Sequence, residues 1–74
     1  MACRVGITTD MEARRRYWEG QHPTLQDWQV ISLHSTKTAA QGAENRAATR
    51  HGCESGDGGD GPEVATWYVY FFTY

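Results

Sequence analysis

Several features that would assign this chain to a familiar class are scarce. There are only two cysteines, Cys3 and Cys53, in 74 residues, too few for the disulfide framework of a small secreted domain. We therefore expect two free thiols and a cytoplasmic protein. Arg4 and Asp10 interrupt any early apolar run, so no secretory signal is visible. No stretch approaches the roughly 18 apolar residues of a membrane span, and we expect no membrane partner.

An excess of charge of one sign is also missing. The formal net charge is −2, which argues weakly against a nucleic-acid binder because such proteins usually carry a basic stripe. Four acidic residues fall in the segment 53–63, and the rest of the chain has seven basic and five acidic residues. This charge balance outside residues 53–63 is compatible with nucleic acid as a partner but does not indicate one.

The length predicts a single small domain over residues 1–74 with a thin core. Strand periodicity covers residues 2–8, and a helix is predicted over 10–20. Thr9 and Glu12 have the spacing of a capping box, in which the two side chains satisfy backbone N–H groups at the helix start. A second strand is predicted over 27–34, with Trp28 and Val30 on one face and Ile31 and Leu33 on the other.

The second half of the chain predicts a helix and a strand. Ser35 or Thr36 can cap a helix from about residue 37 to 51 that ends at Gly52. Segment 53–63 is expected to be a flexible, acidic, Gly-rich loop. Residues 64–74 form an aromatic strand whose tyrosines and Phe72 alternate with Trp67, Val69 and Phe71. The predicted fold is α/β (α+β), ordered β-α-β-α-β, with helices against a three-stranded sheet.

Two stretches, VGITTD at residues 5–10 and WYVYFF at residues 67–72, resemble the signature of the GIY-YIG nuclease family. Single-domain members carry a strand of the type Y-(V/T)-G-I-T followed by T-(D/N)-x-E-R-R along a helix. Residues 5–10 read VGITTD, and Glu12 and Arg14 continue the match. The other half of the signature often reads WYVYIL, and residues 67–72 read WYVYFF. The family also places a Glu four residues after an Ala on a later helix, as Ala40 and Glu44 stand here.

The order of the two halves is reversed relative to the family. The family's signature strands form an antiparallel hairpin, and seven residues separate Tyr70 from Arg4 when the chain is read across its ends. That number is close to a family hairpin connection. The resemblance therefore implies a circular permutation in which segment 53–63 is the new join.

The resemblance implies a metal-dependent phosphodiesterase acting on nucleic acid. Glu44 is the implied ligand of Mg²⁺ or Mn²⁺, Arg14 the implied phosphate-binding arginine, and Tyr70 the GIY tyrosine. Gly6 matches the glycine of YIG, and Tyr68 or Tyr17 would stand in for a missing catalytic tyrosine. The Arg-rich stretch gives the candidate nucleic-acid contacts, which are Arg4, Arg15 and Arg16.

The chain differs from the family signature at two positions, and these differences favour alternatives to the nuclease activity. Arg4 replaces the tyrosine that opens YIG, and Trp18 replaces a common histidine. A structural role also fits each candidate: Glu44 can be a rim carboxylate paired with Arg14 or Lys37, and Tyr70 can be a core residue. An inactive relative is therefore an open alternative.

The rival function is a non-catalytic interaction module. Its aromatic C-terminal strand would bind a protein partner or stack nucleic-acid bases on Tyr68, Tyr70 and Tyr74. A weak homodimer through this strand is a further alternative to a monomer. Cys3, His51 and Cys53 are too few for a recognisable zinc pattern.

Overall fold

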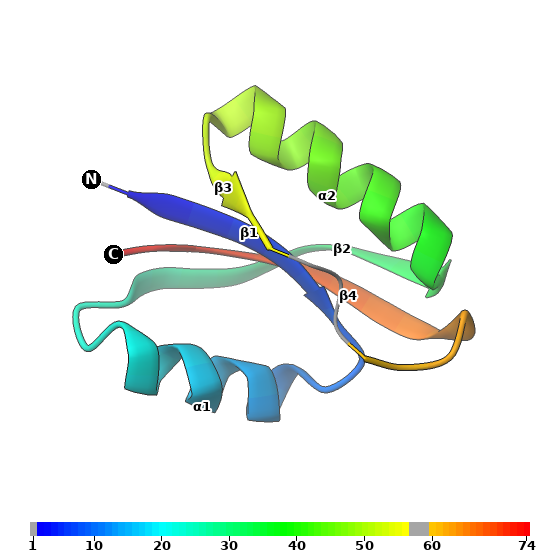
Figure 1. Ribbon diagram of the computed structural model, residues 1–74, viewed down its shortest axis with the longest axis horizontal. Coiled ribbons are helices and arrows are strands. Elements are labelled where there is room, and N and C mark those ends of the chain that lie inside the picture. Colours follow the sequence, from blue (N-terminus) through cyan, green and yellow to red (C-terminus); the bar gives the residue numbers. More distant parts are fainter. Residues whose placement is uncertain (1, 57–59) are drawn as a thin grey trace.

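The computed structural model describes residues 2–56 and 60–74 and contains one mixed sheet with two helices (Figure 1). The elements in chain order are β1 (Cys3–Thr8), α1 (Met11–Gln21), β2 (Gln26–Thr36), α2 (Lys37–His51), β3 (Glu54–Ser55) and β4 (Val64–Thr73). The strand order across the sheet is β2-β4-β1-β3. The α+β class is confirmed, but the predicted three-stranded sheet omitted the short strand β3, which pairs parallel to β1.

The last strand lies in the interior of the sheet. β4 is antiparallel to β1 on one side and to β2 on the other. Both of its edges are therefore hydrogen-bonded, so a homodimer formed along the edge of this strand is not available. The high β-propensity of its aromatic residues agrees with a strand that is covered on both faces.

The face of the sheet toward α2 contains most of the fully buried residues. Small alanines on α2, including Ala40 and Ala48, allow the helix to approach the sheet closely. The core residues that lie in this layer come from β1 and β4, and they are Val5, Ile7, Trp67 and Val69. The predicted separation of the β4 side chains between two faces is confirmed.

The opposite face of the sheet is covered by α1 and by aromatic rings. No residue of α1 is fully buried, and Trp18 provides its contact with β4, with its ring 5.5 Å from that of Phe72. Trp28 on β2 stacks on Tyr70 at 4.8 Å. Figure 1 shows α1 and α2 on opposite sides of the sheet.

The helix starts differ in how well they match the sequence prediction. Asp10, not Thr9, caps α1, because its carboxylate accepts a hydrogen bond from the Ala13 N–H at 3.1 Å. The predicted Thr9–Glu12 capping box is therefore wrong. At α2 the Thr36 hydroxyl accepts from the Ala39 N–H at 3.2 Å, and Gly52 ends the helix in the left-handed conformation, φ 66°, as predicted.

Irregularities in β2 change which face its side chains occupy. The register against β4 shifts between Gln26 and Gln29, between Val30 and Ser32, and between His34 and Thr36. Leu33 consequently pairs with Tyr68, on the α1 face of the sheet. The predicted common face for Ile31 and Leu33 is wrong, because one extra residue in a strand inverts the alternation that follows it.

The two cysteines form a disulfide between Cys3 on β1 and Cys53 just before β3. The expectation of free thiols is wrong, and the argument for a reducing compartment no longer holds. Segment 53–63, predicted as a loop, contains β3, while Asp57 lies outside the described residues. Among those described, no helix is long and apolar enough to cross a membrane.

Candidate functional site

The two stretches that resemble a nuclease signature lie side by side in the sheet. Gly6 on β1 pairs with Tyr70 on β4 in an antiparallel register. The chain ends meet beyond this pair, because Ala2 and Tyr74 exchange two backbone hydrogen bonds, N–H to carbonyl oxygen, of 3.1 and 2.9 Å. Figure 1 shows the N and C labels close together at the same end of the sheet. A short connection between these ends would give a β-hairpin.

The contact between Gly6 and Tyr70 requires a glycine. A Cβ atom built at Gly6 would overlap the hydroxyl and the ring of Tyr70, because the phenol lies across the β1 backbone. The glycine is therefore needed for close approach rather than for an unusual backbone angle.

The Tyr70 hydroxyl is buried and already has a donor. The Trp18 indole Nε1–H donates to it at 2.8 Å, and Tyr70 is only 3% exposed. Burial raises the pKa of Tyr70, and the negative charge of Glu44 raises it further. The Trp18 hydrogen bond and the charges of Arg14 and Arg4 oppose this shift of the pKa. The phenol therefore stays protonated and is a poor base at neutral pH.

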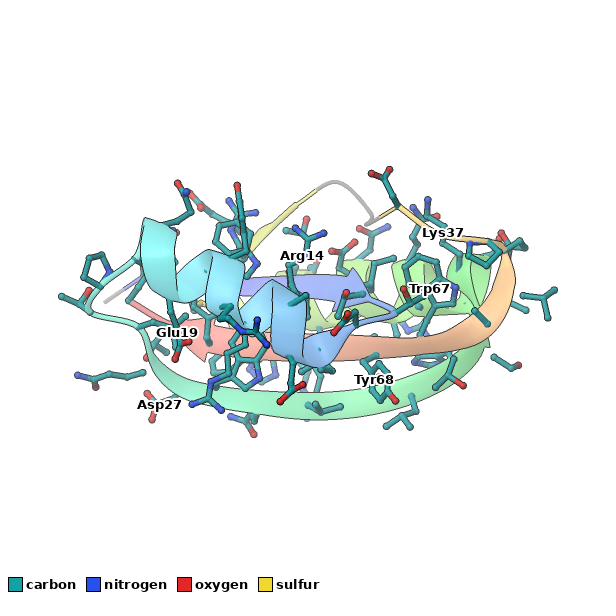
Figure 2. All side chains as sticks on the ribbon, turned by 90° about the horizontal axis from the view of Figure 1, so that it is seen from below. Arg14, Glu19, Asp27, Lys37, Trp67 and Tyr68 are labelled. Carbon is teal, nitrogen blue, oxygen red and sulfur yellow. A yellow bond between two sulfur atoms is a disulfide. The ribbon has the colours of Figure 1, made fainter. Side chains whose placement is uncertain are left out.

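Arg14 and two other residues named from the sequence, Thr9 and Tyr17, line an open cleft. The cleft has a volume of about 320 Å³ and is bounded by Thr8, Thr9, Asp10, Ala13, Arg14, Tyr17 and Asp60. The Arg14 guanidinium carbon lies 5.4 Å from the centre of the Tyr17 ring. Figure 2, drawn from the α1 side, shows Arg14 on the β1 side of α1 and Tyr68 on the β2 side. Tyr68 does not line this cleft.

The other predicted arginines differ in how freely they can bind a ligand. The Arg4 guanidinium pairs with Glu54 at 3.3 Å and lies over the Trp18 ring at 4.7 Å, so it is part of the fold. Arg15 pairs with Glu19 one helical turn away at 3.5 Å. Arg16 is exposed on the same helix. The solvent face of α1 thus provides cations beside the Arg14 cleft.

Glu44 does not line this cleft. It is on the sheet-facing side of α2 and is 3% exposed. Mg²⁺ usually keeps several of its waters when it binds a protein, and a carboxylate buried to this extent leaves little room for a hydrated ion. Among the described residues no group of three or more His, Cys, Asp or Glu is arranged to hold a metal ion. Metal binding by Glu44 stays a prediction.

The structure also restricts the aromatic strand as a stacking surface. Tyr70 is covered by Trp28 and Trp18. Tyr74 stacks on His22 at 4.0 Å, and its hydroxyl donates to Glu54 at 2.8 Å. Only Tyr68 of the three candidate tyrosines remains half-buried without such a contact in the described part of the chain.

Sequence analysis named Tyr17 as a stand-in for the missing catalytic tyrosine, and its spacing of three residues from Arg14 on a helix agrees with the place of both residues at the cleft. Two contacts of this region were missed. Asp60 reaches the cleft from a loop, and Trp18 on α1 donates to Tyr70 on the face of the sheet that α1 covers. No local pattern indicates either of these two contacts.

Comparisons with known proteins give no further identification. Scans against protein-family models, curated proteins and solved structures returned no match to this chain.

Proposed function

We propose that this protein is a nucleic-acid-binding domain with a permuted GIY-YIG-like arrangement, and that Arg14 binds the phosphate backbone. The proposal depends mainly on the register that pairs Gly6 with Tyr70 while the chain ends meet on the same two strands. A hairpin that is cut at its tip and joined elsewhere would produce this arrangement. The helix that follows β1 then presents Arg14 at the cleft.

The chemistry of the cleft suits a phosphate better than a neutral ligand. The planar guanidinium of Arg14 can donate two parallel hydrogen bonds to phosphate oxygens. Arg15 and Arg16 extend the positive surface along α1. Asp10 and Asp60 on the cleft wall oppose an anion, although the Asp10 carboxylate is directed at the helix start. We therefore expect non-specific affinity, with a Kd of about 10⁻⁴–10⁻⁶ M at physiological salt.

Binding without cleavage is the form of this function that the residues support. Tyr70 has a raised pKa and accepts a hydrogen bond from Trp18, and the YIG tyrosine position holds Arg4, which pairs with Glu54. Glu44 is buried on the other helix. Tyr17, the candidate stand-in tyrosine, is exposed beside Arg14, but Glu44, the implied metal ligand, does not line the same cleft.

The test is fluorescence anisotropy with a labelled single-stranded DNA of about 20 nucleotides at low salt. Arg14→Gln removes one charge-assisted phosphate contact and should weaken binding by about fivefold to thirtyfold. It should also lower the slope of log Kd against log salt by about one unit. Arg50→Gln, which removes the same charge on α2, is the matched control and should have no effect. Equal affinities for wild type and Arg14→Gln would refute the proposal.

A nuclease assay tests the alternative that the domain cuts its ligand. We expect intact DNA after incubation with Mg²⁺ or Mn²⁺. Metal-dependent cleavage that disappears in Glu44→Gln, while that variant keeps the wild-type unfolding midpoint, would instead establish the catalytic function.

A further inference from the structure

We infer that the free edge of β2 and the adjoining surface of α2 bind an extended peptide in which acidic and apolar residues alternate. The basic part of this surface is on the face of the sheet opposite the Arg14 cleft, so the inference does not depend on the proposed function. Three features of the described residues support it, namely an unpaired strand edge, exposed apolar side chains and a basic rim.

The strand edge is long and carries no charge or proline over most of its length, although its pairing with β4 is irregular at three places. β2 has 11 residues, is the outermost strand of the sheet, and pairs on one side only, with β4. From Trp28 to Thr36 it has no proline and no Lys, Arg, Asp or Glu. Natural proteins usually block such an edge with charges or proline, because its unpaired N–H and carbonyl groups accept another strand. Peptide recognition by strand addition uses this kind of edge.

Apolar side chains are exposed on both faces of β2. Val30 and Leu33 are 42% and 60% exposed, and their pairing with Tyr70 and Tyr68 places them on the α1 face. Ile31 is 40% exposed and lines two adjoining hollows on the α2 face, of about 160 and 480 Å³. An added strand would cover all three side chains.

The larger of these hollows has positive charge at its rim, from Arg46 and Arg50. His51 lines both hollows, and its ring lies 6.0 Å from that of Phe71 on β4. The single acidic residue of α2, Glu44, is buried on the sheet-facing side of the helix. The accessible part of this helix beside β2 is therefore basic, and it favours an acidic partner.

The two faces together define the occupant. Alternate side chains of an added strand point to opposite faces of the sheet. On the α2 side, a glutamate can lay its methylenes over Ile31 and bring its carboxylate to Arg46 or Arg50. On the α1 side, an apolar residue can cover Val30 and Leu33. An alternating acidic and apolar peptide satisfies both faces at once.

A second copy of this chain fits the edge less well. A twofold axis through the middle of β2 would place two α2 helices on the same face of a continuous sheet. Their Arg46 and Arg50 rims would then approach each other, and like charges brought together at an interface oppose association.

The experiment is an NMR and calorimetric titration of the full chain with a capped peptide of about nine residues that alternates glutamate with valine. We expect amide shifts along β2 and a Kd that rises about tenfold or more in Arg46→Gln/Arg50→Gln. Both arginines lie on α2 outside its buried face, and glutamine has a similar helix propensity, so this variant should fold. The matched variant Arg15→Gln/Arg16→Gln on α1 should bind the peptide like wild type.

Two control peptides separate strand addition from charge attraction alone. N-methylation of alternate amides on the edge that would face β2 should abolish binding, because it removes the main-chain donors and keeps the side chains. Replacement of every glutamate of the peptide by lysine should also abolish binding, because the lysines are repelled by Arg46 and Arg50. Unchanged affinity for either control peptide would overturn the inference.

Three other results would also overturn it. They are no shifts in β2 at millimolar peptide, shifts caused by single-stranded DNA but not by the peptide, and a concentration-dependent dimer that already buries β2. Failure of the Arg14→Gln test would leave the peptide result intact, because the two surfaces share no residue.

Discussion

Removal of the Cys3–Cys53 disulfide should destabilise this domain by more than the loss of one of its hydrogen bonds. The bond joins residues with a sequence separation of 50, and closure of a loop of that length is worth about 4 kcal/mol at 25 °C in the chain-entropy description. A domain of this length has a total stability of about 4–11 kcal/mol. The loss is therefore a large fraction of the whole, equivalent to a fall in the thermal midpoint of about 20–30 °C.

The local consequence of the same change concerns β3. This strand has only two residues and pairs with β1 at Arg4 and Val5. Glu54 on β3 accepts hydrogen bonds from Arg4 and Tyr74, and these contacts depend on the position of β3. Without the disulfide we expect β3 to separate from β1 before the rest of the sheet unfolds.

The assay compares urea unfolding, followed by tryptophan fluorescence, for the oxidised chain, the reduced chain and Cys3→Ser/Cys53→Ser. The reduced chain and the double variant should have the same lowered midpoint, and reductant should not affect the double variant. Hydrogen exchange should show early loss of protection at Ser55. Equal midpoints for the oxidised and reduced chains, or alkylation of both cysteines in the native protein without reductant, would refute the reasoning.

Two further predictions concern close packing and pH. Gly6→Ala should lower the free energy of unfolding by about 1–3 kcal/mol, because its methyl group overlaps the packed Tyr70. The control Gly20→Ala, with open space around it, should be neutral or stabilising. Equal changes in the free energy of unfolding for the two variants would contradict the argument. The pKa of Glu63 is lowered because Thr38 donates backbone and side-chain hydrogen bonds to its carboxylate at the start of α2. The stabilisation by these hydrogen bonds is present at pH values above the pKa of Glu63 in the unfolded chain. It is lost as the pH falls through the lower pKa of Glu63 in the folded protein. Thermal midpoints of wild type and Glu63→Gln should therefore differ at pH 7 and converge below about pH 4, and a constant difference would exclude this cause.

The sequence predicted the elements whose signals are local. The helix Lys37–His51 was found with its start and end because Thr36 and Gly52 act through bonds to residues three or four positions away. The face separation of β4 follows from strict alternation over ten residues. Arg14 was named through the family resemblance, and its role in binding phosphate stays a prediction.

The features that the sequence did not predict depend on distant residues. Two cysteines alone contain no information on whether their strands meet, and β3 is too short to produce a periodic pattern. A register shift in β2 depends on its fit to β4 and inverted the face of Leu33. At α1 both Thr9 and Asp10 are good capping residues, and the Thr8 hydroxyl, which accepts the Asp10 N–H at 3.0 Å, favours the second.

The interior position of β4 also has a consequence for the order in which the protein can fold. β1 and β2 do not pair with each other, and the antiparallel partner of each is β4. β4 is synthesised after both. During translation β1, β2 and both helices are therefore made before β4, the strand that joins β1 to β2. This interval lasts several seconds at typical elongation rates of about 5–20 residues per second. The apolar edge of β2 is exposed throughout this interval. Folding should consequently be a single late step that begins when Val64–Thr73 leaves the ribosome, and a chain that ends before Val64 should not form the sheet.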